Sequence, residues 1–411
     1  MTMAADKQDK VLNVPTLRFP EFSGDWKEST IGKEFELYSG NTPSRLDKEN
    51  FVGDVNWITS GELKDHYIGE TKEKISENSA KENNLRLLPE GTFVIAIYGL
   101  EAEGVRSTGS IITKQSTISQ ACMAFTPKGI ISNEFLYSWY KKHGNVIGIR
   151  YAQGTKQQNL SYDIIEKFKI RYPSLQEQDK LNSFISLLDT RISTQSRIIE
   201  KLKSLMKGLN DYLQDSMPLS YSLSFSDIGE DYSGLSGKAA EDFGGGKPYI
   251  TYVCIYANNF VDDDCCDKVS IDRGEKQNIV LKGDMLFTLS SETPEEVCYG
   301  AVYSGNNAET YLNSFCFGVR NIDGKVFSPY MAYFFNSSRF RREVYPLAQG
   351  STRFNLQKSD FLKKQFSYPS IDDQHRIFEI LNAYDNKLKV ENQILAHYQH
   401  QKEFLLRNLL I

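Results

Sequence analysis

The sequence predicts a mixed α+β protein in which two similar globular domains are joined and separated by two long helices. Three observations support this fold class. The segment AQGTKQQNL at residues 152–160 returns as AQGSTRFNL at residues 348–356. Each copy leads into a stretch with apolar residues spaced three and four apart, which is the pattern of a helix with one apolar stripe. The remainder mixes short apolar runs with Gly, Asn, Ser and Pro, as strands, short helices and turns do.

Length and composition describe a soluble globular protein. The chain has 411 residues, of which 40% are hydrophobic and 25% charged, and this length fits two or three domains. No run approaches the roughly 18 apolar residues of a membrane span. The opening MTMAADKQDKVLNV lacks the apolar core of a secretory signal. We therefore expect a cytoplasmic protein.

The charge balance limits how the chain could hold a nucleic acid. The net charge is −5, and acidic and basic residues are close to balance along the whole sequence. A protein that grips nucleic acid alone is usually basic, because contacts to phosphates supply much of the affinity. If this chain binds DNA, we expect local basic patches and partners that add positive charge.

The internal repeat covers most of the chain. Residues 151–181 align with residues 347–377 without a gap, at an offset of 196. Before these segments the offset drifts to 192–195, and the matched segments are ISQACMAF (118–125) with LNSFCFGV (312–319), PEGTFVIAI (89–97) with LKGDMLFTL (281–289), WITSGEL near Trp57 with YITYVCI near Tyr249, and FELYSGNTPS (35–44) roughly with IGEDYSGLSG (228–237). Because the period is far longer than that of a solenoid repeat, each copy is a domain with an attached helix.

These patterns divide the chain into five segments. FVIAIYG and MLFTLS predict buried strands in the two domains, and EFLYSWYKK and SPYMAYFFNSSRFRREV predict short helices. The predicted segments are a disordered tail (1–15), a first globular domain (16–173), a central helix (174–216), a second globular domain (217–369) and a C-terminal helix (370–411).

Both long helices begin with a capping sequence and carry an apolar seam. Ser174 with Glu177, and Ser370 with Asp373, have the spacing at which two side chains satisfy the free N–H groups of a helix start. The seams span roughly five heptads. The first helix leads from domain one to domain two, so the second must run back for the seams to meet. The sequence therefore predicts an antiparallel coiled coil with a pseudo-twofold relation between the copies.

One polar residue interrupts each seam. Gln195 and Glu391 occupy equivalent positions at the middle of the two predicted helices. In an antiparallel pair with flush ends they would meet and form a polar layer that sets the register at some cost in stability. A functional role is the alternative. If they form such a layer, replacing both by Leu should raise the melting temperature.

The sequence offers no recognisable catalytic or metal-binding motif. It has no phosphate-binding G-x-x-x-x-G-K-[ST], no G-x-G-x-x-G, no H-E-x-x-H, no G-x-S-x-G and no N-P-P-Y. Its six cysteines form no C-x-x-C pair, so buried reduced thiols are expected rather than a zinc site. Asp262–Asp264 fits a solvated acidic loop better than a metal site. We expect a recognition or scaffold protein without a metal or cofactor of its own.

The repeated motifs resemble a known family. Each copy closes with A-Q-G-[ST]-x-x-x-N-L and continues through P-S-[LI]-x-[ED]-Q into a long helix. This arrangement resembles the specificity subunit of type I DNA restriction-modification systems. PTLRFPEFSGDWKESTIGKEFELYSGNTPS in the first half and YSGLSGKAAEDFGGGKPYITY in the second also look like that family. The resemblance covers nearly the whole chain.

The resemblance implies a function and a set of partners. Each globular part would be a target recognition domain that reads one half of a bipartite sequence in double-stranded DNA. The paired helices would fix the spacing and dock two modification (methyltransferase) subunits, through which restriction (motor-nuclease) subunits join. S-adenosylmethionine would sit on the methyltransferase, and ATP and Mg²⁺ on the restriction partner. This chain would be non-catalytic.

Candidate DNA-reading residues are polar side chains in loops marked by glycine. Arg and Lys can read guanine, Asn and Gln can read adenine, and Ser and Thr can read either. The candidates are Asn41, Thr42, Ser44, Arg45, Arg106, Ser107, Thr108, Thr155, Lys156, Gln157 and Gln158 in the first half, with Ser236, Lys238, Ser351, Thr352 and Arg353 in the second. Any of them could equally be an ordinary solvated residue. Asn159 and Asn355, which the two copies share, are expected to cap a turn or helix.

Two other classes of function stay open at this point. A structural adaptor could use the duplicated domains to bind proteins, and loss of DNA binding with the methyltransferase present would favour it. A nuclease could be hidden in the acidic loops, and a magnesium-dependent nick by the isolated chain would reveal it.

Overall fold

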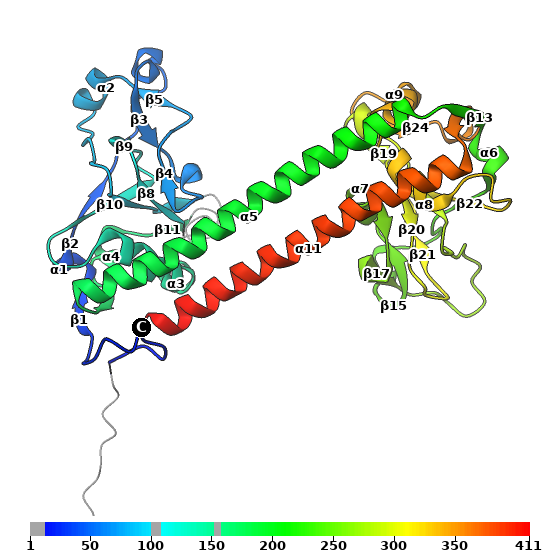
Figure 1. Cartoon of the computed structure of the whole chain (residues 1–411). Helices are drawn as coiled ribbons and strands as arrows, with labels where there is room; N and C mark the ends of the chain where they lie inside the picture. The colour runs from blue at the N-terminus through cyan, green and yellow to red at the C-terminus, as the bar shows by residue number, and fades with distance from the viewer. Residues whose placement is uncertain (1–12, 100–107, 152–157) are drawn as a thin grey trace, which may run out of the picture. The chain divides into compact units, whose positions relative to one another are not determined.

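The computed structural model describes residues 13–99, 108–151 and 158–411 (Figure 1). The chain forms two compact units. Unit 1 contains Met1–Ser196 and Gln393–Ile411, and unit 2 contains Arg197–Asn392. This division places part of each long helix in each unit. The five-segment division of the sequence stays a prediction.

Unit 1 contains a five-stranded sheet, smaller sheets and one longer helix, α3. Its elements up to the first long helix are β1 (Lys27–Thr30), α1 (Ile31–Glu34), β2 (Phe35–Ser39), η1 (Lys48–Phe51), β3 (Val55–Ile58), η2 (Ser60–Glu62), β4 (Tyr67–Ile68), β5 (Lys74–Ile75), α2 (Glu77–Glu82), β6 (Phe93–Ala96), β7 (Tyr98–Gly99), β8 (Gly109–Ile112), β9 (Ser116–Ile118), β10 (Cys122–Pro127), α3 (Asn133–Tyr151), β11 (Gln158–Asn159), α4 (Tyr162–Ile165) and β12 (Lys169–Tyr172). The long helix α5 (Leu175–Ser216) follows.

Unit 2 repeats this sequence of elements with small changes. Its elements are β13 (Leu219–Leu223), α6 (Phe225–Ile228), β14 (Gly229–Ser233), η3 (Ala240–Asp242), β15 (Phe243–Ile250), α7 (Tyr252–Ala257), β16 (Phe260–Val261), η4 (Asp263–Cys265), β17 (Cys266–Val269), β18 (Met285–Thr288), β19 (Ser290–Ser291), η5 (Pro294–Glu296), β20 (Gly300–Tyr303), β21 (Tyr311–Leu312), β22 (Cys316–Asn321), α8 (Ser328–Phe334), α9 (Ser338–Val344), η6 (Tyr345–Leu347), β23 (Ala348–Gln349), β24 (Phe354–Leu356), α10 (Lys358–Lys363) and β25 (Phe366–Pro369), followed by α11 (Ile371–Leu409).

The strand order is the same in both units, which confirms the internal repeat. The central sheet runs β2-β10-β6-β8-β4 in unit 1 and β14-β22-β18-β20-β16 in unit 2. A second sheet runs β5-β3-β9 in unit 1 and β17-β15-β21 in unit 2. The aligned residues Trp57 and Tyr249 occupy matching places in it, since Trp57 pairs with Thr117 and Tyr249 with Tyr311 in parallel.

The central strands are buried because both faces of each sheet are covered. Successive side chains of a strand point to opposite faces. Accordingly, Phe93 and Ile95 of β6 join the core beneath α3, while Val94 and Ala96 join the core on the other face. In unit 2, Phe287 and Leu286 divide between two cores in the same way. This explains why these strands read as continuous apolar runs.

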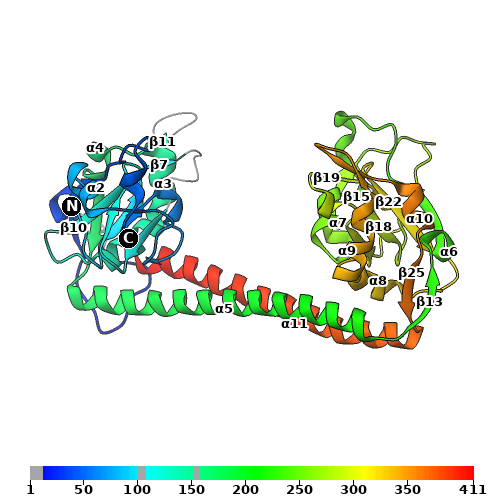
Figure 2. The same cartoon turned by 90° about the horizontal axis from the view of Figure 1, so that it is seen from above.

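The two long helices run antiparallel. In unit 1, Ile185 near the start of α5 shares a core with Leu406 and Leu409 at the end of α11. Figure 2 shows the red end of α11 beside α5. In unit 2, Leu213 at the end of α5 shares a core with Leu381 near the start of α11. The start of each helix therefore packs beside the end of the other, as the sequence predicts. Gln195 is buried and Glu391 half-buried, and their pairing stays a prediction.

A glutamine ties the start of each long helix to its unit in the same way. Gln178 of α5 accepts a hydrogen bond from Ser132 N at 3.0 Å and donates one to Pro173 O at 3.1 Å. Gln374 of α11 accepts from Phe327 N at 2.8 Å and donates to Pro369 O at 3.0 Å. Both side chains are fully buried, so each satisfies backbone groups that would otherwise lack a partner.

The predicted capping boxes form only in part. Ser174 Oγ accepts from Glu177 N at 3.4 Å, and Ser370 Oγ accepts from Asp373 N at 3.2 Å. The Glu177 carboxylate turns away from the helix start and accepts two hydrogen bonds from Arg18, at 2.8 and 2.7 Å. A buried charge-assisted pair is stronger than a cap to backbone N–H, and this pair ties the N-terminal segment to α5.

Two local expectations are wrong. Asn159 and Asn355 lie in strands β11 and β24 instead of capping a turn or helix. Cys254 and Cys265 form a disulfide rather than two free thiols, whereas Cys122, Cys298 and Cys316 are buried thiols as expected. This pairing could not be predicted, because a separation of 11 residues is compatible with many loop conformations.

The predicted short helix of the first half is longer than expected. α3 is continuous from Asn133 to Tyr151, whereas its counterpart in unit 2 breaks into α8 and α9. The break falls at Ser337, whose hydroxyl accepts a hydrogen bond from Phe340 N and so starts a new helix. Over the part of the chain that the structure describes, no helix is both long and apolar enough to cross a membrane.

Candidate nucleic-acid interface

The sequence-predicted DNA-reading residues fall into two groups in each unit. One group follows the first strand of the central sheet and lies against the smaller sheet. In unit 2 the other group lies beside the short strand pair β19–β24, and in unit 1 the described Gln158 lies in the matching pair β7–β11. The two units share these strand pairs, but the described candidates of a unit do not form one cluster.

In unit 1 the loop after β2 is held against the smaller sheet by its backbone. Asn41 N donates to Ile118 O at 3.2 Å, and Asn41 O accepts from Trp57 Nε1 at 3.2 Å. The preceding Gly40 is required by close packing, since a Cβ there would lie 1.9 Å from Ile118 O. The Asn41 side chain donates to Asn83 O at 3.2 Å and accepts from Thr42 N at 2.9 Å. The loop is thus preformed, with Ser44 and Arg45 exposed.

Arg45 is positioned by a carboxylate and two aromatic rings. Its guanidinium donates two hydrogen bonds of 2.8 Å to Glu73 and lies 5.0 Å from the centroid of Phe51 and 5.7 Å from that of Trp57. The hydrogen bonds from Arg45 lower the pKa of Glu73. Because the pair is exposed, its net stabilisation is small, and a phosphate or a guanine could compete with Glu73 for the guanidinium.

The equivalent loop in unit 2 holds its cation more tightly. Ser236 N donates to Gln277 Oε1 at 3.1 Å. Lys238 Nζ lies 2.6 Å from Glu275 Oε2, and only 6% of the Lys238 side chain is exposed. The hydrogen bond from Lys238 is the main cause that lowers the pKa of Glu275 to about 2. The charge of Lys238 is therefore balanced more fully within the protein than that of Arg45.

The second group in unit 2 sits on the tip of a hairpin. Ala348–Gln349 (β23) and Phe354–Leu356 (β24) pair antiparallel. Gly350 between them has φ of +138° and its Cβ would lie 2.0 Å from Arg353 O, so the turn needs glycine. Ser351, Thr352 and Arg353 form the exposed tip.

Thr352 and Arg353 line a cavity of about 780 Å³ in unit 2. Tyr252 donates to Ser290 O at 2.6 Å and Tyr256 to Glu296 Oε1 at 2.6 Å on its wall. The hydrogen bond to Glu296 raises the pKa of Tyr256 to about 12. The lining residues that the sequence did not single out are Tyr252, Tyr256, Ser290, Ser291, Glu292 and Glu296.

The internal repeat could have indicated some of these lining residues. Ser290 pairs with Asn355 across β19 and β24, as Tyr98 pairs with Asn159 across β7 and β11. The loop that follows β7 contains Arg106 and Ser107, so mapping it onto the second copy points to the loop after Ser291. The tyrosines of α7 have no such signal, because their position depends on tertiary packing.

The matching candidates of unit 1 are described only at their edges. Arg106, Ser107, Thr155, Lys156 and Gln157 lie outside the described residues. Thr108 is half-buried and its carbonyl accepts from Ala96 N at 3.0 Å. The backbone of Gln158 pairs with Gly99 in the β7–β11 ladder, which brings the ends of the two candidate loops together.

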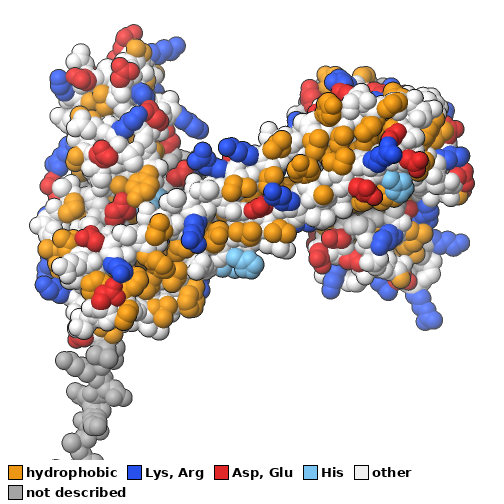
Figure 3. Space-filling view, viewed as in Figure 1, with side chains coloured by type: hydrophobic (Ala, Val, Ile, Leu, Met, Phe, Trp, Pro, Cys, Tyr) orange, Lys and Arg blue, Asp and Glu red, His pale blue; other side chains and the backbone are white. Residues whose placement is uncertain are grey.

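The surface charge agrees with the balanced composition. On the face shown in Figure 3, Lys and Arg side chains are interspersed with Asp and Glu over both units. Within the described ranges, no group of three or more His, Cys, Asp or Glu side chains could hold a metal ion. The described candidates are hydrogen-bonding and cationic side chains on preformed loops, which suit recognition of base edges and phosphates.

Comparison with known families gives two matches in this chain. The family described as "Type I restriction modification DNA specificity domain" matches residues 23–204 and residues 227–397. These two ranges correspond to the two copies of the repeat and together cover most of the sequence.

Curated relatives and solved structures point the same way. The MjaVIII specificity subunit of a type I restriction enzyme from Methanocaldococcus jannaschii is 22% identical over 98% of this chain and 96% of its own length. The MjaIX specificity subunit from the same organism is 29% identical, but the alignment covers 43% of this chain and 42% of the relative. The EcoR124I/EcoR124II specificity subunit of Escherichia coli is 23% identical over 48% of this chain and 49% of the relative.

The fold is shared with solved structures of low sequence identity. The S subunit of a type I restriction-modification system from M. genitalium superposes with a TM-score of 0.53 at 14% identity, covering 97% of this chain and 99% of that one. A chain from a structural study of complex assembly and conformational transition in the type I R-M system gives a TM-score of 0.58 at 13% identity, covering 93% and 96%.

Proposed function

Because the chain belongs to the type I restriction-modification DNA specificity family, we propose that it selects the DNA sequence on which such a complex acts, each unit reading one part of a two-part target. The observation that carries this proposal is the duplication of the family domain together with the shared strand order of the two units. One scaffold used twice, with different loop side chains, suits the reading of two different short sequences.

The preformed loops supply the chemistry of recognition. In unit 2 the hairpin tip carries a hydroxyl and a guanidinium, Thr352 and Arg353, beside a polar cavity. Arginine reads guanine through two parallel hydrogen bonds, and a good pair of this kind discriminates against a wrong base by about 1–3 kcal/mol. In unit 1 the exposed Ser44 and Arg45, with the residues of the β7 and β11 loops, would play this part.

Partner subunits would supply the chemistry and part of the affinity. We assign the methyl transfer to two modification subunits that carry S-adenosylmethionine and dock on α5 and α11. Restriction subunits with ATP and Mg²⁺ would join through them. The balanced charge of this chain supports the assignment, because DNA binding of a complex does not require that one subunit be basic.

A map of methylated bases tests the proposal. The chain is expressed with the methyltransferase encoded beside it in a host without DNA methylation, and modified bases are mapped across the genome. We expect one motif with two specified parts and an unspecified gap. A complex that forms but methylates without any sequence preference would contradict the proposal.

Point variants test whether Arg353 reads a base. Arg353→Ala should relax the preference at a position in only one part of the motif. Arg342→Ala serves as the matched control, because Arg342 is an exposed arginine of α9 that does not line the cavity. If both variants keep the motif unchanged, Arg353 does not read a base.

A further inference from the structure

The same internal position holds a buried side-chain cluster in unit 1 and a cavity in unit 2. Tyr137 corresponds to Tyr333 and Asp189 to Asp385 at the offset of 196 residues that the repeat defines. His66 corresponds to Asn259 by backbone bonding, since Ile111 N donates to His66 O and Val302 N donates to Asn259 O. The cluster of unit 1 can therefore be compared, residue by residue, with the matching place in unit 2.

In unit 1 an imidazole ring occupies the position. The ring of His66 is stacked between those of Tyr67 and Tyr137, with centroid distances of 4.1 and 3.9 Å. Its Nδ1 lies 3.0 Å from Asp189 Oδ2 and its Nε2 lies 2.9 Å from Glu134 Oε2. Only 9% of the side chain is exposed. The scaffold thus holds a flat nitrogen heterocycle stacked between two aromatic rings and hydrogen-bonded to two carboxylates.

A second cation completes the cluster in unit 1. Lys402 Nζ lies 2.5 Å from Asp189 Oδ1. Asp189 therefore contacts two basic side chains, His66 and Lys402. Burial of a carboxylate is tolerated when such partners are present.

Both partners are missing from the corresponding place in unit 2. Asn259 stands where unit 1 has His66, and Met206, at the same offset, stands where it has Lys402. Asp385 accepts a hydrogen bond from Tyr333 Oη at 3.1 Å through one of its two oxygens. Beside it lies a cavity of about 420 Å³, within the range of roughly 300–1,000 Å³ that is usual for small-molecule sites.

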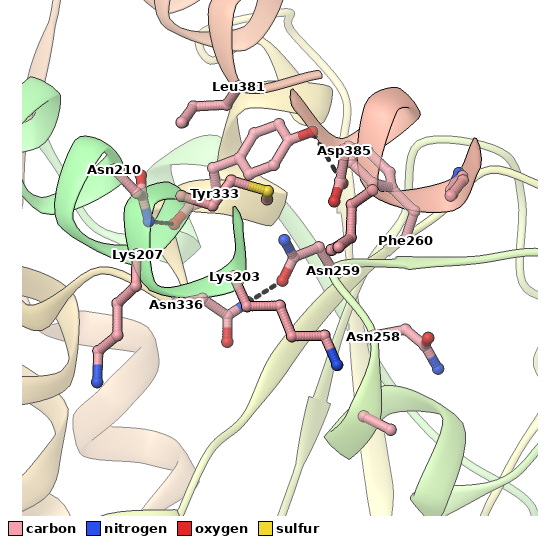
Figure 4. Close-up of a pocket in the computed structure, with 14 residues that line it drawn as sticks. Lys203, Lys207, Asn210, Asn258, Asn259, Phe260, Tyr333, Asn336, Leu381 and Asp385 are labelled. Atoms are coloured by element: carbon pink, nitrogen blue, oxygen red, sulfur yellow. Dashed lines mark hydrogen bonds between the residues drawn. The ribbon is translucent and has the colours of Figure 1, made fainter. Parts of the chain in front are cut away.

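The cavity combines an acidic, an aromatic and a basic region. Asp385, Tyr333 and Phe260 lie toward one end, and Lys203 and Lys207 extend from α5 on the side away from Tyr333 (Figure 4). Lys389 of α11 also lines it. The Phe260 ring stands edge-on to Tyr333, with centroids 5.6 Å apart, and Phe260 is the more accessible of the two, because it is half-buried whereas Tyr333 is only 1% exposed. Carboxamides also line the cavity, and they bond within the protein, as Asn210 does to Tyr333 O at 2.9 Å and Asn336 to Asn259 Oδ1 at 2.9 Å.

We propose that this cavity binds a nucleotide, with the base near Tyr333 and Asp385 and the phosphate at the lysines. The base takes the place of the His66 ring, because a nucleobase is also a flat nitrogen heterocycle that stacks on aromatic rings. A carboxylate accepts a hydrogen bond from an exocyclic amino group of a base. Lysine ammonium groups bind phosphate as point charges. The ligand could be a free nucleotide or a nucleotide turned out of a DNA strand, which presents the same groups.

Calorimetric titration of the whole chain with deoxynucleoside monophosphates tests the binding. We expect saturable binding that is tighter for dCMP and dAMP, which carry an exocyclic amino group, than for dTMP, which has none. Inorganic phosphate alone should bind at least tenfold more weakly. Absence of saturable binding for every nucleotide, or equal binding of phosphate alone, would overturn the proposal.

Substitutions place the ligand in this cavity. Asp385→Asn should weaken dCMP binding about tenfold, as expected when one charge-assisted hydrogen bond is lost, whereas Asp372→Asn on the exposed side of the same helix should leave it unchanged. The double variant Asn259→His, Met206→Lys introduces the counterparts of His66 and Lys402 beside Asp385, so it should abolish binding while the melting temperature stays the same or rises. Unchanged binding in this folded variant would refute the location.

Two DNA duplexes distinguish the sources of the nucleotide. One duplex is fully paired, and the other carries one unpaired extra cytosine. If the ligand comes from a strand, dCMP should compete with the second duplex and the Asp385→Asn variant should lose its preference for it. If the ligand is free, dCMP binds and neither duplex competes with it. Both results support a nucleotide site, and neither depends on the sequence that the complex selects.

Discussion

The two units share their sheets and buried backbone contacts but differ in the side chains that face loops and cavities. Gln178 and Gln374 make the same buried bonds to backbone groups, and the central sheets have the same strand order. By contrast, His66 and Asn259 occupy one position with different chemistry. Buried bonds to the backbone depend on the fold and therefore recur, whereas side chains that face loops and cavities can change without loss of the fold.

The largest effect should come from the helix positions where both units bury the same kind of residue. Ile185 and Leu381 are equivalent and at most 1% exposed. Replacing either by Ala removes buried methyl groups and leaves a cavity, which should lower the free energy of unfolding by about 2–5 kcal/mol. Denaturant unfolding measures this. A loss below about 1 kcal/mol at one site only would show that the helix is not packed alike in the two units.

The His66 cluster should make the stability of unit 1, but not of unit 2, depend on pH near neutrality. Burial alone would lower the pKa of His66, but its hydrogen bonds to Asp189 and Glu134 outweigh burial and raise it. A raised pKa means that folding favours the protonated imidazole. The contribution is therefore complete below the unfolded value of about 6.5 and is lost as the pH rises through the folded-state pKa.

His66→Asn copies the residue of unit 2 and tests this dependence. The variant should lose about 1–3 kcal/mol at pH 6, because hydrogen bonds to charged groups are removed, and less at pH 9. Thermal unfolding of both proteins between these pH values gives the difference. Equal pH profiles for the variant and the natural chain would show that the cluster does not titrate as described.

The two buried glutamines, Gln178 and Gln374, should differ slightly in how much their replacement lowers the free energy of unfolding. Gln178→Leu and Gln374→Leu each leave a backbone N–H and a carbonyl without their partners, at a cost of about 1–3 kcal/mol. Gln374 also donates to Tyr221 Oη at 2.6 Å, so its replacement should cost more. Denaturant unfolding of the two variants under the same conditions measures which replacement costs more stability. A larger loss for Gln178→Leu would contradict the bonding described.

Much of the frame could be predicted because its signals are local in the sequence. The helix starts follow from Ser174 and Ser370, the seams from apolar spacing, and the repeat from aligned segments such as those around Trp57 and Tyr249. The clusters could not be predicted. His66 meets Asp189 and Lys402 only after three distant segments pack together, and no short motif marks such a meeting.

In the candidate site, too, the features with a local sequence signal could be predicted and those that depend on tertiary packing could not. The glycine-marked loops pointed to Arg353 and Arg45, which are exposed as a DNA-reading residue must be. The sequence did not show that Lys238 is buried against Glu275, because an ion pair across 37 residues has no local signature. Nor did it show that Asn159 and Asn355 belong to strands. Their pairing partners, β7 and β19, lie far away along the chain.

A domain exchange tests whether each unit reads one part of the DNA target. Residues 217–369 are replaced by the corresponding segment of a family member with a different known target, and the methylated motif of the complex is mapped again. We expect one part of the motif to change to that of the donor and the other part to stay the same. A motif in which both parts change, or neither does, would contradict the assignment of one reader to each unit.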